Sequence, residues 1–284
     1  MIPTGFDYMK AASLNDALKQ LAAGDDVKVV AGGHSLIPLL RFRLAQPGRL
    51  VDIGHLPDLR GIAEARKGLR IGAATTYREL LDSPLVRERF PVMVDVIEGI
   101  GDRQVRNRGT IGGGLAHADP AADMPPLMLA LDASFTLRSK RGKRAVKARE
   151  FFTGPFMTAM ADDELLIDIY VPPLPRGGSA AYASFEHPAS GYSLAAAAAV
   201  VKMSRRTITG CTVAFTGVSE HAFLGRGFDQ LTGTQGEPEA IDRAAEASLA
   251  DVAATGDIHA PAGYRLHLAR VAARRAIQAA IHRR

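Results

Sequence analysis

Two glycine-rich stretches about eighty residues apart constrain this chain more than any other feature of its sequence. Their sequences are Ala31-Gly32-Gly33-His34-Ser35-Leu36 and Thr110-Ile111-Gly112-Gly113-Gly114. Because glycine has no Cβ, the backbone N–H groups beside it can approach an anion closely, and Ser35 and Thr110 add hydroxyl donors. One such stretch is usually a tight turn. Two of them predict a single ligand with two phosphates held between two loops.

The commoner phosphate-binding motifs are absent. The chain has no G-x-x-x-x-G-K-[ST], which counts against a P-loop nucleotidase. It also has no G-x-G-x-x-G after a strand and before a helix, which counts against a Rossmann site. The sequence therefore predicts a dinucleotide bound by two loops of another kind.

Several segments resemble the FAD-binding medium subunits of the molybdenum hydroxylase family, which includes aerobic carbon monoxide dehydrogenase and xanthine dehydrogenase. The segments are residues 1–8, 31–38 and 43–45, the second glycine stretch continuing into Asp119-Pro120 and Asp123-Met124-Pro125, and residues 261–265. The resemblance thus covers essentially the whole chain.

The resemblance implies an α+β fold in two domains. Residues 1–175 would form an FAD-binding domain of the PCMH, or vanillyl-alcohol-oxidase-like, type, with subdomains of about 1–56 and 57–175. Residues 179–284 would form a small flavoprotein domain with a three-stranded antiparallel sheet covered by helices. The Pro/Gly-rich segment 172–178 is the best candidate for the boundary.

Hydrophobic periodicity predicts the individual elements. Helices are expected at 14–21, after the capping residue Ser13, and at 77–81, 85–100, 124–131, 239–254 and 264–281, with a helical turn at 39–44. Strands are expected at 27–31, 50–53, 69–72, 133–137, 145–146, 165–171, 180–186, 192–203 and 207–218. Alanine is a poor strand former, but the run 195–199 lies between strand-like segments and is assigned to a strand.

Composition limits the class of protein. A hydrophobic content of 47% and a charged content of 23% are typical of a globular protein. No apolar run approaches the roughly 18 residues that span a bilayer, and no secretory signal is visible. We therefore expect a cytoplasmic protein, either free or at the inner face of the membrane. Cys211, the only cysteine, cannot hold an iron–sulfur cluster alone and is expected to be a buried, inert thiol.

Other functions find little support. The net charge of +5 is spread along the chain, and there is no tryptophan, so no nucleic-acid surface is expected. His34, His117, Asp119 and Asp123 lack a compact metal-ligand spacing, so no metal site is expected. No G-x-S-x-G motif or other nucleophile indicates a hydrolase.

The resemblance assigns the FAD phosphates to the backbone of residues 31–36 and 111–114, with the hydroxyls of Ser35 and Thr110. It gives His34, His117 and Asp119 binding roles and places Asp123 near the ribose or adenine half of FAD. Asp123 could instead, or also, cap the helix that follows it. Related subunits often have Asn where this chain has Gly114.

Tyr192 would lie at the flavin ring, and Ile100 and Ile169 would pack against the ring or the adenine. The family pattern before this tyrosine is Lys-x-x-x-Gly-Asp-Tyr. Here Glu186 stands at the Lys position and Gly191 at the Asp position. Loss of a positive charge near the cofactor would lower the reduction potential of the flavin.

The function that the resemblance implies is electron transfer. The chain would bind FAD and accept electrons from [2Fe–2S] clusters on a small partner subunit, while a molybdenum–pterin centre on a large subunit oxidises the substrate. The family implies a dimer of heterotrimers. Two alternatives stay open, a self-contained FAD-dependent oxidoreductase, for which only Tyr192 is a candidate acid–base group, and a flavin-binding module without turnover.

Overall fold

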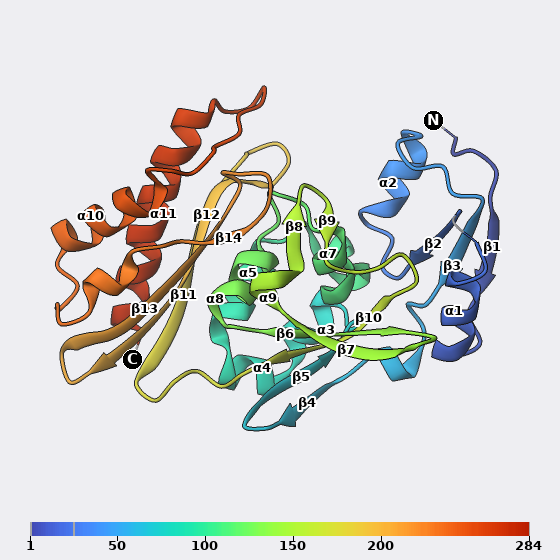
Figure 1. The fold of residues 1–284 in the computed structure, drawn as a ribbon, viewed down its shortest axis with the longest axis horizontal. Helices are drawn as coiled ribbons and strands as arrows, with labels where there is room; N and C mark the ends of the chain where they lie inside the picture. Colours follow the sequence, from blue (N-terminus) through green and yellow to red (C-terminus); the bar gives the residue numbers. More distant parts are fainter. Residues whose placement is uncertain (1, 25, 284) are drawn as a thin grey trace.

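The computed structural model describes residues 2–24 and 26–283 and arranges them in three consecutive parts, each built around one main sheet (Figure 1). The first two parts lie side by side, and the third packs against the second on the side away from the first. The described helices include none that is long and apolar enough to cross a membrane.

The N-terminal part is a three-stranded parallel sheet in the order β1-β3-β2. Its elements are β1 (Asp7–Lys10), α1 (Leu14–Leu21), β2 (Val27–Val30), α2 (Leu36–Arg41), β3 (Arg49–Asp52) and the short 3-10 helix η1 (Pro57–Leu59). The Ser13 hydroxyl caps α1 by accepting the amide N–H of Asp16, as its sequence predicts. Leu14 and Leu18 then pack against the buried Val51 of the central strand. Strand β1 was not predicted.

The middle part is a five-stranded antiparallel sheet in the order β4-β5-β10-β6-β7. Its main strands are β4 (Ile62–Ala65), β5 (Gly68–Gly72), β6 (Ser134–Ser139), β7 (Gly142–Lys147) and β10 (Leu165–Val171), and a small hairpin adds β8 (Phe152–Gly154) and β9 (Met157–Thr158). Its helices are α3 (Tyr77–Asp82), α4 (Pro84–Arg89), α5 (Pro91–Gly99), α6 (Arg103–Arg108), α7 (Ile111–His117), α8 (Met124–Ala130) and α9 (Ala148–Phe151). Strand β10 has the predicted limits because its continuous apolar run is buried between two neighbouring strands.

Two predictions for this part are wrong. The helix expected over 85–100 is broken into α4 and α5, because Pro91 lacks an N–H and holds Phe90 out of the helical conformation, at φ −139° and ψ 63°. The second glycine stretch was expected to be a loop, yet residues 112–114 lie inside α7. The hydroxyl of Thr110 caps this helix and makes it possible despite the three glycines.

The C-terminal part is an antiparallel sheet in the order β11-β12-β13-β14, covered on its outer face by α10 and α11 (Figure 1). Its elements are β11 (Gly178–Glu186), β12 (Ser193–Ser204), β13 (Thr207–Thr216), β14 (Phe223–Leu224), the 3-10 helix η2 (Phe228–Leu231), α10 (Pro238–Leu249) and α11 (Ala262–His282). The sheet has four strands rather than the three expected, because the two-residue β14 pairs with β13.

The alanine run of β12 is a strand, as predicted from its position in the chain. Residues 195–199 are almost completely buried, with odd positions facing α11 and even positions facing α8 of the middle part. Alanine occurs here because both faces of the strand are covered, and its small side chain lets helices approach closely. Small residues of α11, such as Ala272 and Ala276, complete the contact. Tertiary packing outweighs intrinsic propensity.

Candidate functional site

A cleft of about 1070 Å³ runs between the N-terminal and middle parts and ends at the loop between β11 and β12. Its walls come from β2 and α2 on one side and from α7, the start of α8 and the β8–β9 hairpin on the other. This volume is at or above the upper limit for pockets that hold drug-sized ligands, about 300–1,000 Å³. The cleft is therefore large enough for a dinucleotide.

The first glycine stretch turns its backbone toward this cleft. Within the part of the chain that the structure describes, the amide N–H groups of residues 32–36 donate to no protein acceptor. Gly33 has a φ of +79°, in the left-handed region that glycine adopts at little cost. A Cβ on Gly32 would lie 2.2 Å from the carbonyl oxygen of Arg108, so only glycine fits there. Five consecutive unpaired amides form an anion-binding nest of the kind predicted.

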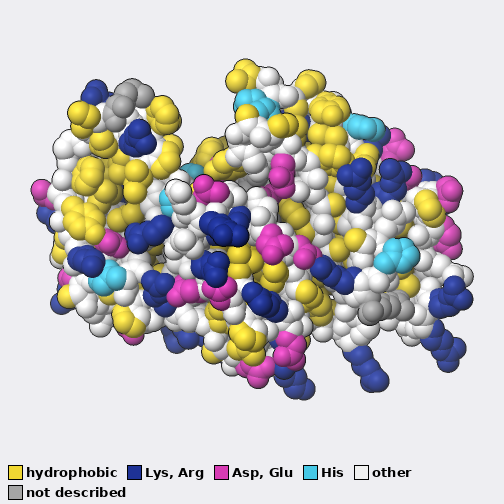
Figure 2. Space-filling model, turned by 180° about the vertical axis from the view of Figure 1, so that it is seen from behind, with side chains coloured by type: hydrophobic (Ala, Val, Ile, Leu, Met, Phe, Trp, Pro, Cys, Tyr) yellow, Lys and Arg dark blue, Asp and Glu magenta, His cyan; other side chains and the backbone are white. Residues whose placement is uncertain are grey.

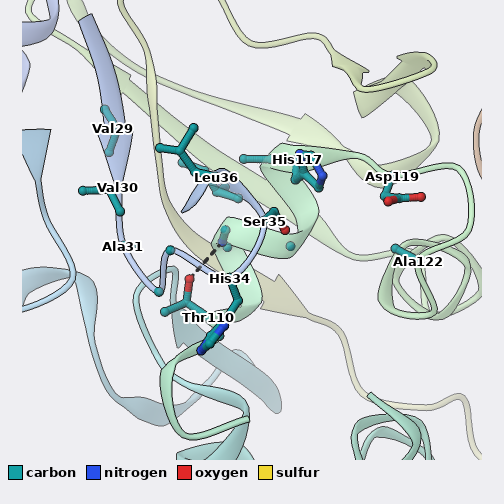
Figure 3. A pocket seen from close by; sticks show the side chains of 18 of the residues that line it. Val29, Val30, Ala31, His34, Ser35, Leu36, Thr110, His117, Asp119 and Ala122 are labelled. Atoms are coloured by element: carbon teal, nitrogen blue, oxygen red, sulfur yellow. Dashed lines mark hydrogen bonds between the residues drawn. The ribbon is translucent and has the colours of Figure 1, made fainter. Parts of the chain in front are cut away.

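The second glycine stretch is different, because its amides already have partners. Gly113 N–H donates to the Thr110 hydroxyl oxygen at 3.1 Å, the bond drawn as a dashed line in Figure 3, and Gly114 N–H donates to the Thr110 carbonyl. Ile111 N–H and Gly112 N–H donate to the carbonyls of Thr75 and Ala73. The prediction that these amides are free to bind phosphate is therefore wrong for this structure. What the stretch offers instead is the O–H of Thr110, which donates to no described residue, and a helix surface without side chains.

The side chain of Tyr77 explains why residue 114 is a glycine. A Cβ at this position would lie 2.4 Å from the hydroxyl oxygen of Tyr77, which is buried directly beneath α7. An asparagine, as in related subunits, would require Tyr77 to move. The glycine is therefore matched to the tyrosine below it.

All but two of the residues predicted to bind FAD line this single cleft. They are Ala31, Gly32, Gly33, His34, Ser35, Leu36, Ile100, Thr110, Gly112, Gly113, Gly114, His117, Asp119, Asp123 and Tyr192. In Figure 3 the first glycine stretch lies opposite α7, whose ends are marked by Thr110 and His117. The two exceptions, Ile111 and Ile169, are completely buried in the core of the middle part and do not line the cleft.

Sequence reasoning missed much of the apolar lining. Val29, Leu39 and Met160 line the cleft but come from three separate segments, so no local pattern links them. Phe156 also lines it, from the turn of the β8–β9 hairpin, with a φ of +56° and a ring 5.1 Å from that of His117. Burial lowers the pKa of His117, against the opposing effect of Asp119, so this ring is held neutral.

Asp123 is the carboxyl whose pKa is most strongly raised among the residues that line the cleft. Tyr182 and Ser193, from the C-terminal part, both donate their hydroxyls to its Oδ1 atom, at 2.5 Å and 2.6 Å. Although Asp123 precedes α8, its side chain makes no capping hydrogen bond, so the alternative role as a helix cap is not observed. Burial raises the pKa of this carboxyl to about 6. The hydrogen bonds from the two hydroxyls act against this rise, whereas the negative charges of Glu186 and Asp119 add to it. Its Oδ2 atom accepts no hydrogen bond from a described residue.

This arrangement predicts a pH-dependent affinity for a ligand that donates hydroxyls to Asp123. An ionised carboxylate is a stronger acceptor than a protonated one, so lowering the pH from about 7.5 to about 5 should weaken FAD binding about tenfold. The stability of the folded chain without ligand changes with pH in the opposite direction. A raised pKa means that the contribution of Asp123 to stability is present at low pH and is lost as the pH rises through about 6.

Fluorescence titration with FAD across this pH range tests the prediction. Asp123→Asn should remove the pH dependence, and Tyr182→Phe should alter it by deleting one hydroxyl donor. Tyr170→Phe is the matched control, because its hydroxyl donates to the Arg66 carbonyl outside the cleft. A pH profile of Asp123→Asn identical to that of the natural chain would show that Asp123 does not contact the ligand.

Tyr192 stands at the end of the cleft, and 49% of its surface is exposed. Burial raises its pKa, and the charges of Asp119 and Asp123 act in the same direction, so the residue stays a neutral phenol. It cannot serve as a general base near neutral pH. Gly191 before it has a φ of +72°, which suits glycine better than the aspartate of the family pattern.

Glu186, at the family's lysine position, ends β11 and does not line the cleft. It accepts a hydrogen bond from the Ser184 hydroxyl at 3.2 Å, and its charge helps to raise the pKa of Asp123. The described residues contain no group of three or more His, Cys, Asp or Glu side chains placed to hold a metal ion. Burial raises the pKa of the Cys211 thiol to about 12, which makes it unreactive.

Comparison with known proteins identifies the family. Residues 4–174 match the family described as the FAD-binding domain in molybdopterin dehydrogenase, and residues 180–280 match the CO dehydrogenase flavoprotein C-terminal domain. The chain is 37% identical to the carbon monoxide dehydrogenase medium chain of Hydrogenophaga pseudoflava, over 99% of this chain and 98% of that one. It is 36% identical to subunit alpha of the 6-hydroxypseudooxynicotine dehydrogenase complex of Paenarthrobacter nicotinovorans, over 100% and 97%.

The fold agrees with these matches. A crystal structure of Cu,Mo-CO dehydrogenase in its cyanide-inactivated form contains a chain that superposes on this one with a TM-score of 0.96, at 37% identity and with both chains fully covered. The protein therefore belongs to the FAD-binding medium subunits of the molybdenum hydroxylases. The predicted family, the α+β fold with an FAD-binding domain followed by a flavoprotein domain, and the class of oxidoreductase subunit are confirmed.

Proposed function

We propose that this chain binds one FAD along the cleft and carries electrons from iron–sulfur clusters on a partner chain to an external acceptor. The observation that carries the proposal is the nest of five unpaired amides at residues 32–36, which faces a cleft of dinucleotide size in a chain of this family. Consecutive N–H groups that point the same way and have no protein acceptor concentrate positive potential, so such a nest favours an anion.

Each part of the cleft has a separate task in this proposal. The amides of residues 32–36 hold one phosphate, while the O–H of Thr110 donates to the second. The Oδ2 atom of Asp123 accepts hydroxyl groups of the ribityl or ribose part. Ile100 and Tyr192 supply an apolar and an aromatic surface for a ring. FAD, once bound, supplies the reversible uptake of electrons, and the protein supplies binding, orientation and electrostatics.

The partners follow from the kind of subunit. The only cysteine, Cys211, cannot hold a cluster, which needs about four thiolates. We infer a small subunit with [2Fe–2S] clusters and a large subunit with the molybdenum–pterin centre, assembled as a dimer of heterotrimers. The relatives are named for the oxidation of carbon monoxide and of 6-hydroxypseudooxynicotine, so similar medium subunits serve different substrates. The large subunit therefore selects the substrate.

We also propose a domain division at residues 176–178, with an FAD-binding domain of 1–175 and a flavoprotein domain of 179–284. Two observations support it. The segment between β10 and β11 contains no helix or strand, and the two family matches end at 174 and begin at 180. Across this boundary Ala180 and Ala198 are buried in the hydrophobic core of the middle part, so the two domains are in contact.

The experiment that tests the function is purification of the assembled complex, followed by FAD analysis and reductive titration. One FAD per copy of this chain, reduced when the substrate of the complex is added, is the expected result. A chain that retains no FAD and cannot be loaded with it would overturn the proposal. FAD reduction by a substrate in the absence of partner chains would favour the self-contained oxidoreductase, and a flavin that is never reduced would favour the module without turnover.

A further inference from the structure

The corner between α5 and α6, defined here as residues 98–106, forms one wall of the cleft. Ile100, Gly101 and Val105 line the cleft at this corner, and Ile100 also packs against the core of the middle part. Gly101 has a φ of +51°, and a Cβ on it would lie 2.9 Å from the Cβ of Val105. The Oδ1 atom of Asp102 caps α6 by accepting the Val105 N–H at 2.8 Å. The corner is therefore tightly packed and has little space for another conformation.

Arg106 joins the two sides of this corner. Its Nη1 atom donates to the carbonyl oxygens of Glu98, Ile100 and Gly101, each at 3.0 Å. No other described residue donates to these three carbonyls. Helix α5 ends at Gly99, and the last carbonyls of a helix have no partner within it. Arg106 supplies the missing donors and places a positive charge at the negative end of α5.

Arg106 has no counter-ion among the described residues. Other cations of this protein are surrounded differently, because Lys and Arg side chains lie among Asp and Glu side chains in the middle of the face shown in Figure 2. Arg78, for example, pairs with Asp82 at 2.6 Å. Glu186 comes near the corner, where its Oε1 atom would lie 3.3 Å from a Cβ on Gly99, but it forms no ion pair with Arg106. All hydrogen bonds of the Arg106 side chain therefore serve to fix one backbone turn.

The other end of α6 supports the amide nest of residues 32–36. Arg108 is the last residue of this helix, and a Cβ on Gly32 would lie only 2.2 Å from its carbonyl oxygen, because the two backbones touch there. Helix α6 thus contacts the nest at one end and, through Arg106, holds Ile100 at the other. Its six residues span about 9 Å. This helix therefore sets the distance between the nest and the wall that contains Ile100.

We propose that Arg106 is a positioning residue for the cofactor, which holds Ile100 at a fixed distance from the nest so that Ile100 packs against one ring of FAD. This inference rests on the proposed function. A dinucleotide held only by its phosphates can still turn its rings, and a second wall at a fixed distance prevents this. Arg106 does not line the cleft itself, so it acts through Ile100.

The test measures the binding of FAD, and of its two halves as FMN and ADP, to the assembled complex after removal of FAD. Arg106→Met keeps a long side chain but lacks the donors, and we expect it to weaken FAD binding about tenfold. The same loss should appear with only one of FMN and ADP, because Ile100 meets only one ring. Arg106→Lys, whose ammonium group has three donors, should restore most of the affinity.

Arg103→Met is the matched control for these measurements. Arg103 is an exposed cation at the start of the same helix, and it makes no hydrogen bond or ion pair with a described residue. Its replacement should leave the affinities for FAD, FMN and ADP unchanged. Thermal unfolding of each variant measures any loss of stability separately from the loss of binding.

A double-mutant cycle distinguishes the positioning role from a general structural role. Ile100→Ala should itself weaken FAD binding, and adding Arg106→Met to it should cost a further factor of about two or less, because Arg106 acts through Ile100. A purely structural arginine would lower the affinity by the same factor in both backgrounds.

Four results would overturn the proposal. They are an unchanged FAD affinity of Ile100→Ala, equal losses for FMN and ADP in Arg106→Met, independent effects of the two substitutions in the double variant, and an equal loss in Arg103→Met. The first of these needs no variant at Arg106, so the proposal stays testable even if Arg106→Met does not fold. A natural complex that cannot be reloaded with FAD would contradict the proposed function itself, whereas natural FAD affinity in Arg106→Met would contradict only the role of Arg106.

Discussion

Replacing Gly32 by alanine is expected to weaken FAD binding by about 10- to 100-fold, because over-packing of this kind costs about 1–3 kcal/mol. The new Cβ would lie 2.2 Å from the Arg108 carbonyl oxygen and 2.9 Å from the Gly109 Cα atom. Both are backbone atoms and cannot rotate away. The first glycine stretch must therefore move into the cleft, which separates its amide nest from the phosphate that it holds.

Equilibrium titration of the purified variant with FAD measures this effect, and thermal unfolding measures any accompanying loss of stability. Gly5→Ala is the matched control, since a Cβ at Gly5 meets no atom within 4 Å. The control should bind FAD as the natural chain does. If Gly32→Ala also binds FAD with unchanged affinity, the amides of residues 32–36 do not hold the phosphate.

The second large effect is expected at Arg265, whose replacement by methionine should lower the free energy of unfolding by about 3–5 kcal/mol, because three backbone carbonyls lose their donor and each unsatisfied buried acceptor costs about 1–3 kcal/mol. This side chain is 7% exposed and holds together the ends of β12 and β13 and the loop before α11. It donates to the carbonyls of Leu194 at 2.7 Å, Gly217 at 2.8 Å and Ala260 at 3.4 Å, and to the carboxylate of Asp257 at 2.8 Å. Methionine fills the space but leaves these acceptors without their donor.

Urea unfolding of Arg265→Met gives the size of the loss, and Arg274→Met is the control. Arg274 also pairs with a carboxylate, Asp242 at 3.1 Å, but on the surface, where such pairs contribute about 0–1 kcal/mol. Equal destabilisation of the two variants would contradict the prediction.

Arg265→Met should also change how the free energy of unfolding depends on pH in acid. The hydrogen bond from Arg265 lowers the pKa of Asp257 to about 2, so the contribution of this carboxylate is present above its ordinary pKa of 3.8 and is lost as the pH falls through 2. Removing Arg265 should therefore remove this part of the acid sensitivity.

Much of the fold could be predicted from local sequence. Ser13 and the periodic leucines after it determine α1, and the apolar run of 165–171 determines β10, because capping and burial periodicity act over a few residues. Strands β11 to β13 followed from their spacing and from the turn at 204–206. The fourth strand, β14, could not be predicted, since two residues carry no periodic signal.

The candidate site was predictable in its residue types but only partly in its geometry. The two glycine stretches lie on opposite walls of one cleft, as expected of a ligand held between them. The two stretches differ, however, in whether their amides are already hydrogen-bonded. The amides of the second stretch donate to protein acceptors, including Thr110 at the start of α7, while those of the first donate to no described residue. A run of three glycines predicts a loop by propensity, and only the packing of α7 over Ala73 and Tyr77 reverses that preference.

The sequence by itself determined the family, the succession of elements and the existence of an anion-binding backbone, because these depend on residues close together in the chain. Tertiary structure alone decided what depends on distant residues. It brought Tyr182 and Ser193 to Asp123 across separations of 59 and 70 residues, and it placed Ile169 in the core rather than in the lining of the cleft. Which side chains are buried is a property of the folded chain and cannot be read from any local pattern. The raised pKa of Asp123 is one consequence of its burial.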